Sequence, residues 1–133
     1  AIAGQIEQTE KQLKAHSDVR CHAVAKRLAA AREAFLDVVE FFVTESKSNP
    51  NAVYAGSVPY LMLAGNLMSG WQMARAMLVA LEHIAKEDDV AFMHAKVTTA
   101  RFYADHILSK APGVRDSIVA GADTVTEMAL EAF

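Results

Sequence analysis

The chain has 133 residues, of which 53% are hydrophobic and 22% charged, with a formal net charge of −3. This length suits one domain with a continuous core that needs no disulfide or metal. The small negative charge and the scattered basic residues exclude nucleic acid and anionic membranes as expected partners. The apolar share is above the usual value, so we expect either an unusually large interior or an interface that a partner covers.

Cys21 is the one cysteine, which leaves no intramolecular disulfide, no Cys-x-x-Cys pair and no cysteine zinc site. A single unpaired cysteine fits the reducing environment of the cytoplasm. Residues 1–16 are too polar for a signal peptide. Residues 52–74 carry no charge and are long enough to span a bilayer, but they include Pro59, Asn66, Gln72 and several small residues. We therefore expect a helix surrounded by other helices and no membrane segment.

Apolar side chains at steps of three and four predict the first two helices. Residues 2–15 carry a sparse stripe, and the pairs Glu7/Lys11 and Glu10/Lys14 suit an exposed helix. Ser17 is the expected cap of a second helix that ends before a break at residues 46–51. Its core stripe is Cys21, Val24, Leu28, Ala31, Phe35, Val38 and Phe42. A second apolar face near its end predicts deeper burial there: Leu36, Val39, Phe41 and Val43.

Asn49 as a cap and Pro50 at the first helical position start a third helix, which Pro59 is expected to kink or split. Its core stripe is Leu63, Leu67, Gly70, Ala74, Met77, Leu81 and Ile84. Other apolar residues, with a buried Trp71 among them, cover the remaining faces: Leu61, Met68, Trp71 and Leu78. This helix is therefore expected at the centre of the bundle.

A polar turn at residues 86–89 precedes a fourth helix, whose core stripe is Val90, Met93, Val97, Ala100, Ala104 and Ile107. Ala111-Pro112-Gly113 is expected to end it. A short helix at about residues 114–120 follows, with Gly121 as a left-handed cap. No strand-like alternation occurs, so the predicted class is all-α. We expect one domain over residues 1–133, an antiparallel up-and-down bundle of three to four main helices plus short terminal helices.

No motif in the chain predicts a catalytic, cofactor-binding or metal site. Gly65 and Gly70 have the spacing of the outer glycines in a phosphate-binding loop. The motif fails, because Trp71 and Gln72 stand where it needs Lys and Ser/Thr. Close packing of a neighbouring helix against these small residues explains the glycines better. The tightest set of possible metal ligands is interpreted as a solvated acidic turn: Glu82, His83, Glu87, Asp88, Asp89 and His94. Cys21 is expected to be a buried structural thiol. Arg101 and Asp105 are the expected local ion pair.

Two strings are distinctive, namely Val58-Pro59-Tyr60-Leu61 running on to Gly70-Trp71-Gln72-Met73-Ala74-Arg75, and Ala95-Lys96-Val97-Thr98-Thr99-Ala100-Arg101-Phe102-Tyr103-Ala104. With Gly121-Ala122-Asp123, they resemble the extra C-terminal domain of a bacterial branch of the acyl-CoA dehydrogenases, the methylmercaptopropionyl-CoA dehydrogenase-like branch. The resemblance is clearest from residue 50 to residue 126.

The resemblance implies a larger parent enzyme that binds FAD and removes hydrogens from the α and β carbons of an acyl-CoA thioester, with electron-transferring flavoprotein as its oxidant. The family's catalytic-base segment, often Tyr-Glu-Gly, has no counterpart, since Tyr54-Ala55-Gly56 lacks the carboxylate. The implied role of this chain is structural: an inactive helical module that holds no cofactor, packs on the catalytic body and belongs to a homo-oligomer. Arg75 and Arg101 should each find a carboxylate or a helix C-terminus, inside the bundle or across an interface.

Two alternatives remain at this point. A stand-alone protein-interaction or oligomerisation module would explain the same stripes. A carrier of small ligands or acyl chains would need an internal cavity lined by the Met and Phe residues.

Overall fold

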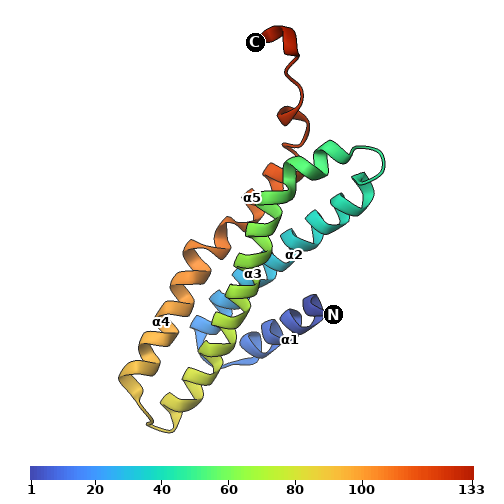
Figure 1. The fold of residues 1–133 in the computed structure, drawn as a ribbon. Coiled ribbons are helices and arrows are strands. Elements are labelled where there is room, and N and C mark those ends of the chain that lie inside the picture. The colour runs from blue at the N-terminus through green and yellow to red at the C-terminus, as the bar shows by residue number, and fades with distance from the viewer.

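The structure is a computed structural model that describes residues 1–133, and all of its regular elements are helical. The main helices are α1 (Ile2–Ala15), α2 (Val19–Glu45), α3 (Pro50–Ala85) and α4 (Val90–His106), followed by a shorter α5 (Ala111–Val119). Single 3₁₀ turns are η1 (Leu108–Lys110), η2 (Asp123–Val125) and η3 (Leu130–Ala132). The long helices alternate in direction, and α5 continues the course of α4 (Figure 1). The predicted all-α bundle is confirmed.

The helical stripes read from the sequence form most of the core. In α3, the stripe from Leu63 to Leu81 is buried, and Ile84 is half-buried. The stripe of α2 is buried from Cys21 to Val38 except for a half-buried Phe35. The predicted deeper burial at the end of α2 is wrong, because Val43 is 72% exposed. Phe35 stacks against Tyr60 of α3, and the Phe42 ring is tilted against the same tyrosine.

Several helix ends differ from the prediction. Asp18, not Ser17, caps α2, and its carboxylate accepts a hydrogen bond from the Arg20 backbone N–H at 2.9 Å. For Pro59, the expected kink and not the expected split agrees with the structure, because α3 is uninterrupted but its first turns lean away from the rest in Figure 1. Pro112 belongs to the first turn of α5 rather than to a stop, because a helix tolerates proline where its N–H has no intrahelical partner.

Gly121 is not the left-handed cap that the sequence suggests, since no glycine has a positive φ. A Cβ at this position would lie 2.5 Å from the Ser117 carbonyl oxygen. Close approach of the backbone therefore explains the glycine. Residues 123–133 extend beyond the bundle, as Figure 1 shows, and Leu130 and Phe133 are exposed.

Two polar contacts fasten α1 to the bundle. The Glu10 carboxylate, which is 2% exposed, accepts two hydrogen bonds from Arg32 of α2, at 2.6 Å from Nε and 3.2 Å from Nη2. The Trp71 indole N–H of α3 donates to Thr9 Oγ1 at 2.9 Å, and Thr9 donates to the Gln5 carbonyl. Trp71 is half-buried, less than predicted. These contacts hold one face of α1 against α2 and α3.

Some ion pairs in the structure differ from those that the spacing of charged residues along each helix predicts. Glu7 and Lys11 pair at 3.7 Å as predicted. Glu10 pairs with Arg32 instead of Lys14, and Asp105 lies 3.8 Å from Arg27 of α2 instead of pairing with Arg101. Both changes replace a contact within one helix by a contact between two helices, which helix spacing does not show.

Asp18 should make the stability of the bundle depend on acid pH. Its hydrogen bonds to the Arg20 side chain hold its pKa at about 2, below the usual 3.8. Because the folded-state pKa is lowered, the stabilisation is present above pH 3.8 and is lost as the pH falls toward 2. We expect Asp18→Asn, which keeps a capping oxygen, to cost about 1 kcal/mol at neutral pH and almost nothing near pH 2. Urea unfolding at both pH values measures this, and an equal loss at both would contradict it.

Candidate functional site

The outer face of α3 is an exposed surface without charged side chains. No Asp, Glu, Lys or Arg occurs from residue 50 to residue 74. Eight exposed residues on this helix recur at steps of one, three or four and lie on one side of it: Tyr54, Val58, Leu61, Met62, Gly65, Ser69, Gln72 and Ala76. We call this set the α3 outer face. At 1.5 Å per residue it runs for about 33 Å along the helix.

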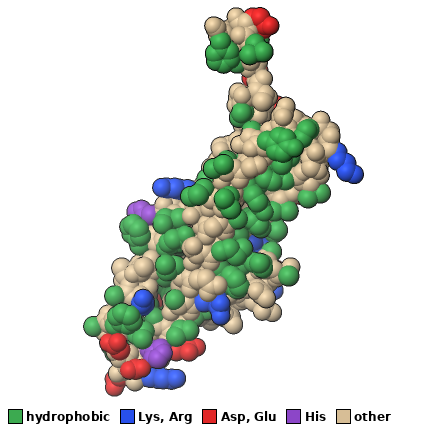
Figure 2. All heavy atoms as spheres, in the orientation of Figure 1, with side chains coloured by type: hydrophobic (Ala, Val, Ile, Leu, Met, Phe, Trp, Pro, Cys, Tyr) green, Lys and Arg blue, Asp and Glu red, His purple; other side chains and the backbone are tan.

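The two halves of the α3 outer face have different shapes. Tyr54, Val58 and Leu61 in the N-terminal half are each 68–72% exposed. The C-terminal half is a shallow hollow of about 470 Å³ lined by Met68, Ser69, Gln72, Met73 and Ala76. Figure 2 shows hydrophobic side chains gathered along this side of the molecule, over α3. Contiguous exposed apolar surface of this kind marks an interaction site.

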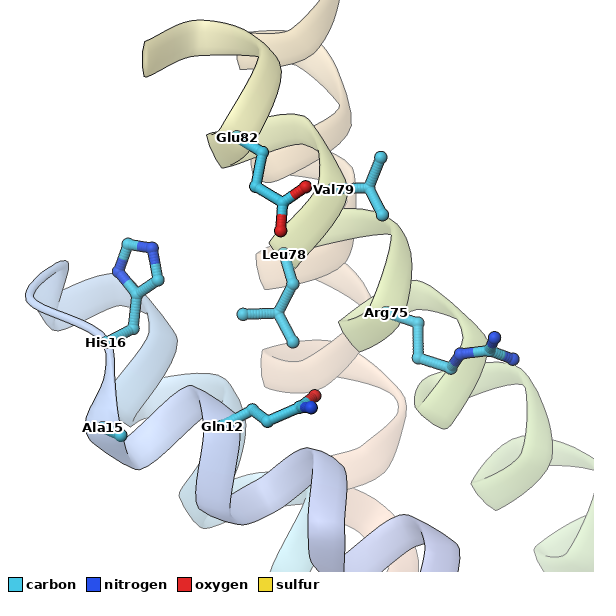
Figure 3. A pocket seen from close by; sticks show the side chains of 7 residues that line it. All are labelled: Gln12, Ala15, His16, Arg75, Leu78, Val79 and Glu82. Atoms are coloured by element: carbon cyan, nitrogen blue, oxygen red, sulfur yellow. The ribbon is translucent and has the colours of Figure 1, made fainter. Parts of the chain in front are cut away.

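A larger open hollow of about 710 Å³ lies between the C-terminal turn of α1 and α3. Figure 3 shows Leu78 pointing toward α1, whereas Arg75 and Val79 point away from it. Arg75 lies 5.4 Å from the Trp71 ring centre and donates to Gln72 Oε1 at 3.0 Å. Glu82 lines the same hollow.

The other residues singled out in the sequence have structural contacts. Cys21 is fully buried, and burial raises the pKa of its thiol, which leaves it unreactive. In the acidic turn, His83 Nδ1 lies 2.8 Å from Asp88 Oδ2, but no three His, Cys, Asp or Glu side chains converge on one point. Gly70, which matches an outer glycine of the phosphate-loop motif, faces Leu108. The side-chain atoms of Leu108 would lie 2.6–2.9 Å from a Cβ added at Gly70.

The interior offers no room for an acyl chain. The enclosed apolar cavity between α2, α3 and the α4–α5 connection measures about 30 Å³ and is lined by residues that include Leu63, Leu67 and Leu108. That volume suits a single water molecule. The acyl-carrier alternative therefore has no support in the structure. None of the helices is both long and apolar enough to cross a membrane.

The model of the family described as "Acetyl-CoA dehydrogenase C-terminal like" matches residues 2–129. The chain belongs to this family. It is also 35% identical over 129 residues to the 3-methylmercaptopropionyl-CoA dehydrogenase of Ruegeria pomeroyi. That match covers 97% of this chain but 22% of the relative. The chain is thus the C-terminal domain of an acyl-CoA dehydrogenase-like protein, as the motifs predicted, and it spans about a fifth of that relative's length.

The family motifs fall on different parts of this acyl-CoA dehydrogenase C-terminal domain. Val58 and Leu61 of the first string lie on the α3 outer face, and Trp71 fastens α1. In the second string Val97, Ala100 and Ala104 are buried, whereas Arg101 is exposed and has no partner in the domain. Sequence reasoning assigned residues 52–74 to a surrounded core helix and so missed the outer face. One signal in the sequence could have revealed the outer face: the residues of α3 opposite its core stripe carry no charge, although solvent-exposed helix positions usually do.

Proposed function

We propose that this domain is a non-catalytic structural and assembly domain of an FAD-dependent acyl-CoA dehydrogenase-like oxidoreductase. The reaction proposed for the parent enzyme is the α,β-dehydrogenation of an acyl-CoA thioester, with electron-transferring flavoprotein as the oxidant, in the cytoplasm. The observation that carries the proposal is the family match over residues 2–129 together with the 22% share of the relative. A catalytic body outside this domain is the natural holder of FAD, acyl-CoA and the catalytic base.

The use of charged residues supports a structural role. Three arginines join α2 to its neighbours: Arg32 to Glu10 of α1, Arg27 to Asp105 of α4, and Asp37 to Arg115 of α5 at 3.2 Å. Of these pairs only Glu10–Arg32 is largely buried, so it is the one whose charges are firmly engaged in the folded state. The exposed apolar residues on α3 and in the C-terminal segment supply surface that assembly would cover.

Removal of residues 1–133 from the full-length parent tests the assembly role. We expect the truncated enzyme to bind FAD but to lose solubility or change its oligomeric state, because apolar surface that the domain covers becomes exposed. Sedimentation velocity and the flavin absorbance of the same samples measure both properties. A truncated enzyme with unchanged solubility and unchanged oligomeric state would contradict the proposal.

A further inference from the structure

The exposed sides of the four main helices differ in charge. Three of them carry exposed charged side chains: Glu7, Lys11 and Lys14 on α1; Lys26, Arg27, Glu33, Asp37 and Glu40 on α2; Lys96, Arg101 and Asp105 on α4. The α3 outer face has none from residue 50 to residue 74, and Tyr54, Val58 and Leu61 on it are 68–72% exposed. Since water solvates charged side chains well and apolar ones poorly, the α3 outer face is the side of the bundle that most needs a covering partner.

The size of the α3 outer face distinguishes a free partner from a tethered one. A strip about 33 Å long and as wide as a helix, about 10–12 Å, covers about 350 Å². A freely associating partner buries about 800 Å² on each side of a stable contact. Contacts between domains of one polypeptide bury about 600–1,500 Å² over both sides, and the connecting chain keeps the partner at an effective concentration on the order of 1 mM. Twice the area of the α3 strip falls in this second range, so the face suits a tethered partner better than a free second copy.

The first helix places the rest of the polypeptide within reach of this face. The match covers 22% of the relative, so most of that protein lies outside it, and in a C-terminal domain the remainder joins the bundle at α1. The α1 helix follows α3 in the same direction: Trp71 donates to Thr9, and further along both helices Gln12 and Leu78 line one hollow (Figure 3). Figure 1 shows the N-terminus level with the middle of α3. A body attached there can reach the α3 outer face.

We propose that the catalytic body of the same polypeptide packs on the α3 outer face. This assignment rests on the proposed function, which gives the parent enzyme such a body. The two halves of the face define the surface that the body presents. A groove receives Tyr54, Val58 and Leu61, and an apolar side chain enters the hollow lined by Met68 and Met73. The body's surface is uncharged there, because a charge buried against this face would find no partner.

Photo-cross-linking in the full-length, flavin-loaded enzyme tests which surface touches the face. Tyr54, replaced by p-benzoylphenylalanine, should cross-link to a peptide of the catalytic body, and the product should keep the mass of one chain. Phe102 on the exposed side of α4 is the matched control, since it is aromatic and 59% exposed, and the same replacement there should give no such product. Cross-links from position 54 to a second chain, or none at all, would overturn the proposal.

The rate of thiol labelling in the full-length enzyme tests whether the hollow is covered. Ala76→Cys lies in the hollow and Ala95→Cys on the exposed side of α4, so the two variants carry the same change at exposed helical positions. Relative to the rates in the urea-unfolded enzyme, the native enzyme should label Ala76→Cys roughly tenfold or more slowly than Ala95→Cys. Equal protection of the two thiols would refute the contact.

Failure of this assignment differs from failure of the assembly role. If truncation changes solubility or oligomeric state but Ala76→Cys labels as fast as Ala95→Cys, the domain covers the body with another surface, and only the assignment of the α3 outer face is wrong. A truncated enzyme with both properties unchanged refutes the assembly role, whereas the cross-link from position 54 still decides the contact.

Discussion

Arg32→Ala should lower the free energy of unfolding by about 3 to 5 kcal/mol. The substitution leaves the Glu10 carboxylate, which is 2% exposed, without either of its two hydrogen-bond donors. In the native pair Arg32 donates both hydrogen bonds to the Glu10 carboxylate, and these bonds raise the pKa of Arg32. An unpaired buried carboxylate must either carry its desolvation cost or take up a proton, and both responses destabilise α1 on the bundle.

Arg27→Ala is the matched control for this prediction. Its partner Asp105 lies 3.8 Å away, and both side chains are more than 40% exposed. We expect a loss below about 1 kcal/mol, because water screens an exposed pair and solvates the remaining charge. Urea unfolding followed by circular dichroism measures both variants. Equal losses would mean that the Glu10–Arg32 pair does not fasten α1, and that packing alone holds this helix.

Leu67→Ala should destabilise the domain by about 3 to 5 kcal/mol, whereas Leu61→Ala should change its monomer stability by less than about 0.5 kcal/mol. Leu67 is 1% exposed in the core and Leu61 is 68% exposed on the α3 outer face. The same atoms are removed from the same helix, so the difference reports burial alone. The first substitution leaves a cavity that rigid neighbours fill incompletely.

These two variants are compared by denaturant midpoint. A similar midpoint shift for both would place Leu61 in a buried environment and contradict the description of the outer face. The pair of substitutions therefore separates the core face of α3 from its outer face.

The sequence predicts the helices well because each buries a stripe at the helical period. Leu63, Leu67, Ala74, Met77 and Leu81 follow that period and are all buried. Helix ends are predicted less well, because they depend on a few local contacts. Asp18 and Ser17 are both good capping residues, and the bond from the Arg20 backbone N–H decides between them.

Contacts between helices are not predictable from spacing alone. Glu10 has Lys14 one turn away, yet it binds Arg32, which the turn between α1 and α2 brings beside it. Gly65 and Gly70 look alike in the sequence, but Leu108 packs on one and nothing packs on the other. The candidate interaction surface depends on this second difference, so it follows from the tertiary structure. Family membership, by contrast, can be predicted from short sequence motifs whose residues the helical period alone does not require.

The central claim, that this domain supports assembly and not chemistry, is tested most directly by turnover per bound flavin in the full-length enzyme. Arg101→Ala and Arg75→Ala remove the two arginines that form no ion pair within the domain, since Arg101 has no internal partner and Arg75 contacts only Gln72 and Trp71. We expect turnover per flavin within about twofold of the unmodified enzyme, with any loss of activity explained by stability or flavin content. A loss of about a thousandfold at unchanged stability and flavin content, roughly 4 kcal/mol of transition-state stabilisation, would contradict the claim and place the domain at the active site.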